Sequence, residues 1–280
     1  MMQRTERITS IKDVSGWASV GLMAFGFVAL YLVNYLVPLA KSNYTTRIWD
    51  WTELALTAFA SVILASHWRA IRTRTMWIGG TLGLLSGLSY LVDDSSLRGA
   101  VTEGIAVWLT FLAGTVLLQN LKRHAIAAFR PPWTAMARSV GFGILLGIPL
   151  AALKNLFFYL QNGAPRLHNI FVSAAEAMSP GIHEEAVVRY FILAICFSLL
   201  KESPRPRLVM IAAIALAVVP HSLLHLPDLF LENPVMAVVM LVATSLLFGL
   251  PMALLQIKRS FEAAVAFHWF IDFVRFWFGY

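Results

Sequence analysis

The sequence contains one cysteine, Cys196, and few charged residues, and both shortages exclude classes of protein. A single cysteine forms no disulfide within the chain and no cysteine-based metal cluster. Charged residues make up 13% of the chain, against about 25% in soluble domains. The sequence also lacks low-complexity linkers and paired halves with matching broken helices, which argues against separate soluble domains and against a transporter.

Apolar residues dominate what is present. They make up 59% of the chain, and the mean hydropathy is +0.71, so we expect a protein whose solvent is the lipid bilayer. The formal net charge of +7 would suit a nucleic-acid-binding protein. Here, however, the Lys and Arg residues lie between apolar segments and not in one patch, so no nucleic-acid partner is predicted.

Nine apolar segments are candidates for membrane-spanning helices, which need about 20 residues. The first has no small-residue cleavage site, so we expect an uncleaved span. The sequence therefore predicts an all-α, polytopic transmembrane helical bundle of about nine spans, and the polar residues of its four C-terminal helices predict a polar cavity there. The segments are Trp17 to Val37, Trp51 to His67, Met76 to Val92, Gly99 to Leu121, Ala135 to Leu160, Ile170 to Leu200, Leu208 to Leu226, Val235 to Ile257 and Phe261 to Phe278.

The distribution of basic residues predicts the orientation, because short cytoplasmic loops carry excess Lys and Arg. With the N-terminus inside and the C-terminus outside, the outer segments hold five: Lys41, Arg47, Arg98, Arg166 and Arg275. The inner segments hold fifteen: Arg4, Arg7, Lys12, Arg69, Arg72, Arg74, Lys122, Arg123, Arg130, Arg138, Lys201, Arg205, Arg207, Lys258 and Arg259. We expect an integral, multi-pass protein of a membrane such as the bacterial cytoplasmic membrane. Tryptophans near the predicted ends, Trp49 among them, are typical of the interface.

The sixth segment is too long for a simple span, and Ser179-Pro180-Gly181 interrupts it. We predict a short helix from Ile170 to Met178, followed by a span from Ile182. Non-helical backbone at membrane depth is tolerated only beside protein or a water-filled cavity. The break therefore predicts a cavity beside Glu184.

Two adjacent carboxylates and an arginine follow this break. Glu185 and Arg189 are four residues apart on a helix, so we predict an ion pair that lowers the cost of burying both. Glu184 is rotated by about 100° from Glu185, so it remains available for acid or base chemistry. A purely structural ion pair, with Glu184 facing a loop, is the alternative from these residues alone.

Two later segments carry histidines at helical spacing. His221 and His225 share one face of the seventh segment, and His268 and Asp272 share one face of the ninth. Each pair by itself also fits a structural or interfacial role, but together with the acidic pair they indicate a shared site. For Lys154, on the fifth segment, we expect a side chain that extends to the membrane interface.

In their order along the chain these motifs resemble the CPBP family, which includes type II CAAX prenyl endopeptidases and Abi-like bacteriocin-processing and immunity proteins. Glu184, Glu185 and Arg189 match its first motif, and His268 and Asp272 match its third. The second motif is usually Phe-x-x-x-His, and here His221 stands at the phenylalanine position before His225. The resemblance covers residues 170–280, whereas residues 1–165 carry no recognised motif.

The resemblance implies an intramembrane, glutamate-dependent endopeptidase that needs no cofactor and cleaves a hydrophobic peptide or membrane-protein precursor of CAAX or bacteriocin type. In that mechanism Glu184 and His225 activate water, and Glu185 and Arg189 brace the helix. His268 stabilises the oxyanion, with Asp272 orienting it through the ring nitrogen that faces away from substrate.

Two alternatives remain open from the sequence. One is a zinc-dependent protease that binds the metal through Glu184, His221, His225 and His268. The other is a non-enzymatic immunity or peptide-binding protein. Depth counting places Glu184 and His225 toward the outer half of the bilayer, whereas cleavage of cytosolic prenylated tails would need access from inside.

Overall fold

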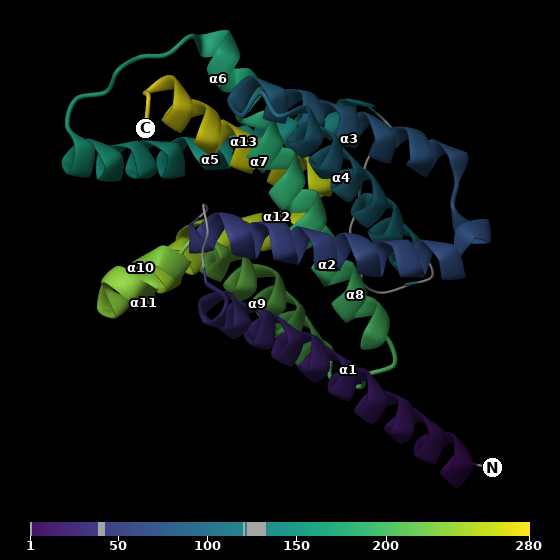
Figure 1. Ribbon diagram of the computed structural model, residues 1–280. Helices are drawn as coiled ribbons and strands as arrows, with labels where there is room; N and C mark the ends of the chain where they lie inside the picture. Colours follow the sequence, from purple (N-terminus) through teal and green to yellow (C-terminus); the bar gives the residue numbers. More distant parts are fainter. Residues whose placement is uncertain (1, 39–42, 120, 122–132) are drawn as a thin grey trace.

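The computed structural model describes the whole chain except residues 1, 39–42, 120 and 122–132, and the described part is helical without strands (Figure 1). This confirms the all-α prediction. Four basic residues used to predict the orientation lie outside the described residues: Lys41, Lys122, Arg123 and Arg130.

Five long helices form the N-terminal half of the chain, with a short 3₁₀ turn, η1 (Trp68–Ala70), after the second. The five are α1 (Met2–Leu36), α2 (Tyr44–Ser66), α3 (Thr73–Asp93), α4 (Leu97–Leu118) and α5 (Trp133–Asn162).

The C-terminal half is more broken. The expected sixth segment forms α6 (Ile170–Glu176), α7 (Met178–His183), the π-helical η2 (Glu184–Tyr190) and α8 (Phe191–Leu199). The rest comprises α9 (Pro206–Leu224), α10 (Pro227–Glu232), α11 (Pro234–Thr244), the π-helical η3 (Ser245–Gly249), α12 (Leu250–Lys258) and α13 (Phe261–Trp277).

Seven stretches in the described part are long and apolar enough to cross a membrane. They correspond to seven of the nine expected spans. The other two are the interrupted segment from α6 to α8 and the 17-residue α13. The expected break is present: α6 ends at Glu176 and Ala177 separates it from α7. The break precedes Ser179-Pro180-Gly181, because Pro180 lies in the first turn of α7, where a missing N–H costs least.

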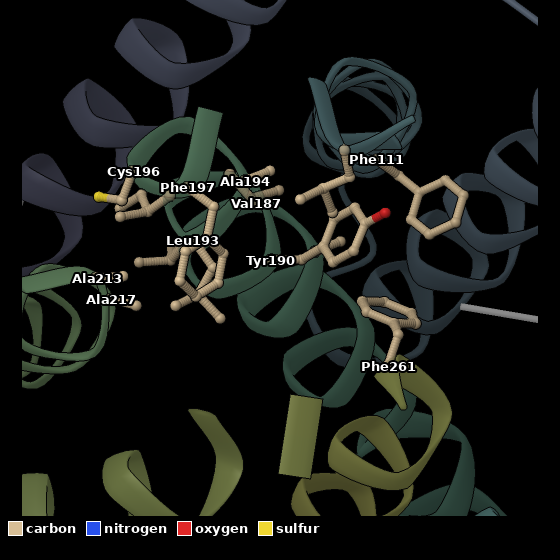
Figure 2. Close-up of a cluster of buried hydrophobic side chains, with 14 of the residues drawn as sticks. Phe111, Val187, Tyr190, Leu193, Ala194, Cys196, Phe197, Ala213, Ala217 and Phe261 are labelled. Atoms are coloured by element: carbon tan, nitrogen blue, oxygen red, sulfur yellow. The ribbon is translucent and has the colours of Figure 1, made fainter. Parts of the chain in front are cut away.

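The largest hydrophobic core surrounds η2 and α8 and draws residues from both halves of the chain (Figure 2). The ring of Tyr190 stacks on Phe111 of α4 at 5.3 Å and meets Phe261 of α13 edge-on at 5.4 Å. On the other side of α8, Phe197 and Leu193 lie in the same cluster as Ala213 of α9. The N-terminal helices therefore share one core with the segment that carries the acidic pair.

Two glycines allow α13 to approach its neighbours closely. A Cβ at Gly143 would collide with the carbonyl oxygen of Ala263, so a larger residue would push α5 away from α13. A Cβ at Gly181 would lie 3.1 Å from the Cβ of Trp269, so α7 also packs closely on α13. These contacts place the fifth helix and the acidic pair beside the helix that carries His268.

Asp228 of α10 caps the start of α2 from outside that helix. Its carboxylate accepts hydrogen bonds from the N–H groups of Tyr44 and Thr45 and from the Thr45 hydroxyl at 2.6 Å. Burial acts to raise the pKa of Asp228, but the hydrogen bonds from Thr45 and Tyr44 outweigh it and hold that pKa below its ordinary value. α10, which follows the two histidines of α9, is thereby attached to α2.

We expect Asp228→Asn to lower the free energy of unfolding by about 1 kcal/mol at pH 7, the usual cost of losing a helix cap. Because the folded-state pKa is lowered, the stabilisation is present above the ordinary pKa and is lost as the pH falls through the lowered value. The difference between wild type and Asp228→Asn in denaturant titrations should therefore shrink below about pH 4. Glu232→Gln, at an exposed position of the same helix, is the control. An equal difference at pH 7 and at pH 3 would contradict this prediction.

Candidate active site

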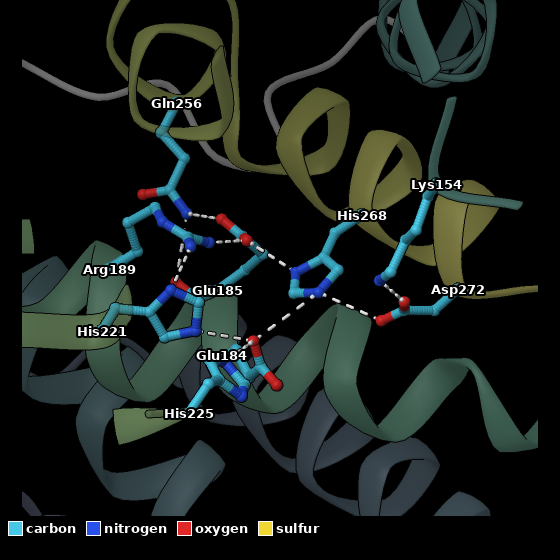
Figure 3. A network of polar contacts seen from close by, with 9 residues as sticks. All are labelled: Lys154, Glu184, Glu185, Arg189, His221, His225, Gln256, His268 and Asp272. Carbon is cyan, nitrogen blue, oxygen red and sulfur yellow. Dashed lines mark hydrogen bonds and ion pairs between the residues drawn. The ribbon is translucent and has the colours of Figure 1, made fainter. Parts of the chain in front are cut away.

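The acidic pair lies at the start of η2, and its two carboxylates face different neighbours (Figure 3). The side chain of Glu184 is 13% exposed and points toward the histidines of α9. The side chain of Glu185 is fully buried and points toward α12 and α13. π-Helical turns within helices frequently mark functional sites. The predicted division of the pair into two environments is present.

Glu185 is held by partners from three elements. Arg189, on the next turn of η2, forms the predicted ion pair with Glu185 Oε1, and both side chains are fully buried. The Gln256 amide of α12 donates to Glu185 Oε2 at 2.8 Å and to the Glu185 carbonyl oxygen at 3.1 Å. His268 Nδ1 of α13 lies 2.9 Å from Glu185 Oε1. A buried carboxylate needs such partners to offset desolvation, so Glu185 joins η2, α12 and α13.

His221 connects Arg189 with Glu184. Its Nδ1 lies 2.6 Å from Arg189 Nη2, and its Nε2 lies 2.6 Å from Glu184 Oε2. A guanidinium only donates hydrogen bonds, so Nδ1 must be the unprotonated acceptor. The ring is therefore neutral, with its proton on Nε2, and donates that proton to Glu184.

His225 is the more open of the two α9 histidines. It caps the C-terminus of the helix, and its side chain is 45% exposed. Its Nε2 lies 3.9 Å from Glu184 Oε2, which is too far for a hydrogen bond and close enough for a bridging water. Trp49 of α2 contacts both imidazoles edge-on, at 5.7 Å from His221 and 5.2 Å from His225.

His268 stands between the carboxylates of η2 and Asp272. Its Nε2 lies 3.2 Å from Asp272 Oδ2, in the expected pairing four residues along α13, and 3.6 Å from Glu184 Oε2. Since Nδ1 contacts Glu185, each ring nitrogen of His268 faces a carboxylate. Glu185 rather than Asp272 contacts the ring nitrogen farther from Glu184. We expected Asp272 to contact the ring nitrogen that faces away from the substrate, and this expectation is wrong because Asp272 contacts Nε2, the nitrogen nearer Glu184.

Lys154 of α5 is part of this network. Its Nζ donates to Asp272 Oδ1 at 2.6 Å, and Arg275 Nε lies 3.6 Å from the same oxygen. The expectation that Lys154 extends to the membrane interface was wrong, because a buried carboxylate on α13 supplies a partner that favours an inward-pointing side chain. Lys154 precedes the motif-bearing part of the chain, so the fifth helix contributes to the site.

The polar network forms one wall of a cavity of about 490 Å³. Glu184, His225 and His268 line it together with apolar side chains of α5, α11, η3 and α12. The apolar lining includes Leu153, Phe157, Phe158, Met240, Leu247, Phe248 and Met252. A cavity beside Glu184 was predicted from the helix break, and its apolar walls suit a hydrophobic chain next to a few polar groups.

The residues expected in the zinc alternative do not fit a metal centre in this arrangement. Donor atoms of Glu184, His221 and His225 lie within 4.8 Å of one another. However, Arg189 occupies Nδ1 of His221, so Nε2 carries the proton and has no free electron pair for a metal. Both nitrogens of His268 are likewise directed at carboxylates.

Sequence reasoning missed two contributors, Gln256 and Trp49. Gln256 is an uncharged polar residue within an apolar segment, and its full burial requires hydrogen-bond partners, which Glu185 supplies. This one amide side chain within an apolar segment was the sequence signal that could have indicated a buried hydrogen-bonding role for Gln256. Trp49 lies near a helix end, as an interfacial tryptophan would, and no sequence signal places it against His221 and His225, which lie 172 and 176 positions later.

These features define a multi-pass integral membrane protein with a buried site of carboxylates and imidazoles beside an apolar cavity. Residues 166–274 match the family model described as type II CAAX prenyl endopeptidase Rce1-like. This region contains all three motifs, and the match agrees with the resemblance predicted from the sequence and indicates a peptide-bond hydrolase of the CAAX-type intramembrane protease class. Neither the comparison with curated proteins nor that with solved structures found a match.

Proposed function

We propose that the protein hydrolyses a peptide bond in a membrane-associated precursor by a glutamate-dependent mechanism that requires no metal. The observation that carries this proposal is the position of Glu184. Its carboxylate lies on the cavity wall and points at three imidazoles, whereas the neighbouring Glu185 is fully occupied by Arg189 and Gln256. Of the two adjacent carboxylates, Glu184 is the one with access to a substrate.

The first step is activation of water. Glu184 Oε2 and His225 Nε2 are 3.9 Å apart, so one water can accept or donate a hydrogen bond of about 2.8 Å at each. Glu184 takes a proton as the water oxygen attacks the peptide carbonyl carbon, and His225 orients the same water. A base within hydrogen-bond reach of the proton it removes is the first requirement for general-base catalysis.

The second step is stabilisation and collapse of the tetrahedral intermediate. The His268 Nε2–H, which faces Asp272 Oδ2 in the structure without substrate, turns to the developing oxyanion and donates to it, while Lys154 remains as the partner of Asp272. When the C–N bond breaks, protonated Glu184 returns its proton to the leaving nitrogen. The products are a new carboxyl group and a new amine, and Glu184 is again ionised.

The substrate proposed here is a hydrophobic peptide or membrane-protein precursor, of CAAX or bacteriocin type. The apolar cavity walls support it, because an extended hydrophobic chain would find few polar groups there except the catalytic ones. Large exposed apolar side chains on α5 and α11, beside the cavity, suit contact with lipid.

Comparison of membrane proteomes from cells with wild-type protein and with Glu184→Gln tests activity and identifies substrates together. We expect one or more membrane-associated precursors to accumulate uncut in the Glu184→Gln cells, with the matching new termini absent. Cells with Glu232→Gln, at an exposed position of α10, are the matched control and should resemble wild type. Identical termini in wild-type and Glu184→Gln cells would reject proteolysis and favour a peptide-binding or immunity protein.

Metal removal should leave turnover unchanged. Arg189 keeps the proton on His221 Nε2, so the cluster lacks the ligands of a catalytic zinc site. We expect purified protein to contain less than about 0.1 equivalent of zinc by elemental analysis and to retain its activity after dialysis against a chelator, since a required zinc would be stoichiometric. Stoichiometric zinc together with turnover that is lost on chelation and restored by zinc would contradict the metal-free mechanism.

A further inference from the structure

His221 is the most tightly engaged imidazole in the network. The residue is 6% exposed, and both ring nitrogens are within 2.6 Å of a charged partner, Arg189 on one side and Glu184 on the other. His225, four residues later, has no contact with Glu184 shorter than 3.9 Å. The α9 histidine closest to Glu184 is therefore the one at the position where the resembling motif has phenylalanine.

Arg189, His221 and Glu184 form a series of hydrogen bonds, and Arg189 determines the direction of each bond. Arg189 can only donate, so His221 accepts at Nδ1 and donates at Nε2 to Glu184 Oε2. Because Arg189 is also bound to the fully buried Glu185, it cannot swing away and release the imidazole. The proton on His221 Nε2 therefore points at Glu184 in the arrangement that contains the Glu185–Arg189 pair.

The imidazole itself is confined by its surroundings. Trp49 packs against the ring edge-on, with the ring planes at 81°, and His221 lies in the last turn of α9 between buried Pro220 and Ser222. The confined ring and the fixed direction of its hydrogen bonds together give Glu184 Oε2 a hydrogen-bond donor in a defined place. That atom also lies 3.6 Å from His268 Nε2 and 3.9 Å from His225 Nε2, so a rotation of the carboxylate would misplace the base relative to both.

We propose that His221 is a positioning residue of the reaction, which transmits the fixed geometry of the Glu185–Arg189 pair to the base Glu184. This inference rests on the proposed function of Glu184 as the base. It assigns His221 no contact with substrate and no ligand role for a metal. Residues that orient the ligands of metal sites typically affect activity by about 10- to 100-fold, and we expect an effect of similar size from a residue that orients a catalytic carboxylate.

Three substitutions separate the two contacts of His221. His221→Phe keeps an aromatic ring and removes both contacts. His221→Gln reaches far enough for its amide N–H to donate to Glu184, at the position of Nε2. His221→Asn is shorter, so its amide oxygen can accept from Arg189, at the position of Nδ1, without reaching Glu184.

The probe for turnover is a quenched fluorescent peptide with a farnesylated cysteine four residues from its C-terminus, in proteoliposomes, with the unfarnesylated peptide beside it. For His221→Phe we expect kcat to fall about 10- to 100-fold and KM to change less than about 2-fold, since positioning acts on the transition state. His221→Gln should recover much of kcat, whereas His221→Asn should recover stability but not kcat. If His221 only stabilised the fold, His221→Asn would recover more of kcat than His221→Gln.

A second measurement needs no substrate. In protein labelled with ¹⁵N at histidine, the His221 signals, assigned by their loss in His221→Phe, should report a neutral ring protonated at Nε2. A ring protonated at Nδ1, or wild-type kcat in His221→Phe, would overturn the proposal. The failure of the proposed function itself has another signature, namely equal cleavage by wild type and Glu184→Gln.

Discussion

Glu184→Gln is expected to lower kcat of the purified protein by about 10²- to 10⁴-fold, the usual contribution of a positioned general base. Glutamine has nearly the same size and shape as glutamate but does not accept a proton from water near neutral pH. Its amide oxygen can still accept the hydrogen bond from His221 Nε2, so the network should remain in place. Single-turnover cleavage of the farnesylated peptide, or of a precursor found in the membrane comparison, measures the effect.

The control for this loss is the melting temperature in the same detergent. We expect it to stay close to the wild-type value, because Glu184 lies on the cavity wall and makes no ion pair with Arg189 or Lys154 in the described structure. Glu232→Gln should retain both stability and turnover. Cleavage by Glu184→Gln at more than half the wild-type rate would exclude Glu184 as the base and direct attention to His225.

Arg189→Leu should have the largest effect on stability, about 3 to 5 kcal/mol, because it leaves a fully buried carboxylate without its cation. The substitution also removes the donor to His221 Nδ1. Denaturant titration in bicelles measures the free energy of unfolding. Arg207→Leu, at an exposed position of α9, is the control and should change stability by less than about 0.5 kcal/mol.

The double variant Glu185→Leu with Arg189→Leu distinguishes stability from function. Removal of both charges eliminates the unpaired carboxylate, so most of the lost stability should return. Turnover should not return, because His268 Nδ1 and His221 Nδ1 both lose their partners. A double variant that is no more stable than Arg189→Leu alone would contradict the assignment of the stability loss to a buried, uncompensated Glu185.

Local patterns predicted several elements of the site correctly. The spacing of Glu185 and Arg189 and that of His268 and Asp272 predicted pairs on one helix face, and both pairs are present. The helix break before Glu184 was predicted from proline and glycine, and the structure has it within a few residues. These predictions succeeded because they depend on helical periodicity and backbone preference, which act over three or four residues.

Other features follow from contacts between distant helices. Lys154 binds Asp272, 118 residues later, and Gln256 binds Glu185, 71 residues earlier. Neither partner is indicated by periodicity, and the inward direction of Lys154 depends on a carboxylate delivered by α13. The close approach of α5 to α13 in turn depends on Gly143, whose neighbour across the contact is not visible in the sequence.

The sequence by itself determined that this chain is an all-helical membrane protein, and its ordered motifs indicated the protease family. Composition and short-range spacing suffice for that, because burying charge in a bilayer is costly and the few ionisable residues there stand out. Only the tertiary structure decided which histidine touches Glu184, which group lies behind His268, and that the fifth helix supplies a cation. Those choices depend on distances and hydrogen-bond directions between helices far apart in the chain, where donors and acceptors must match one to one in a water-poor interior.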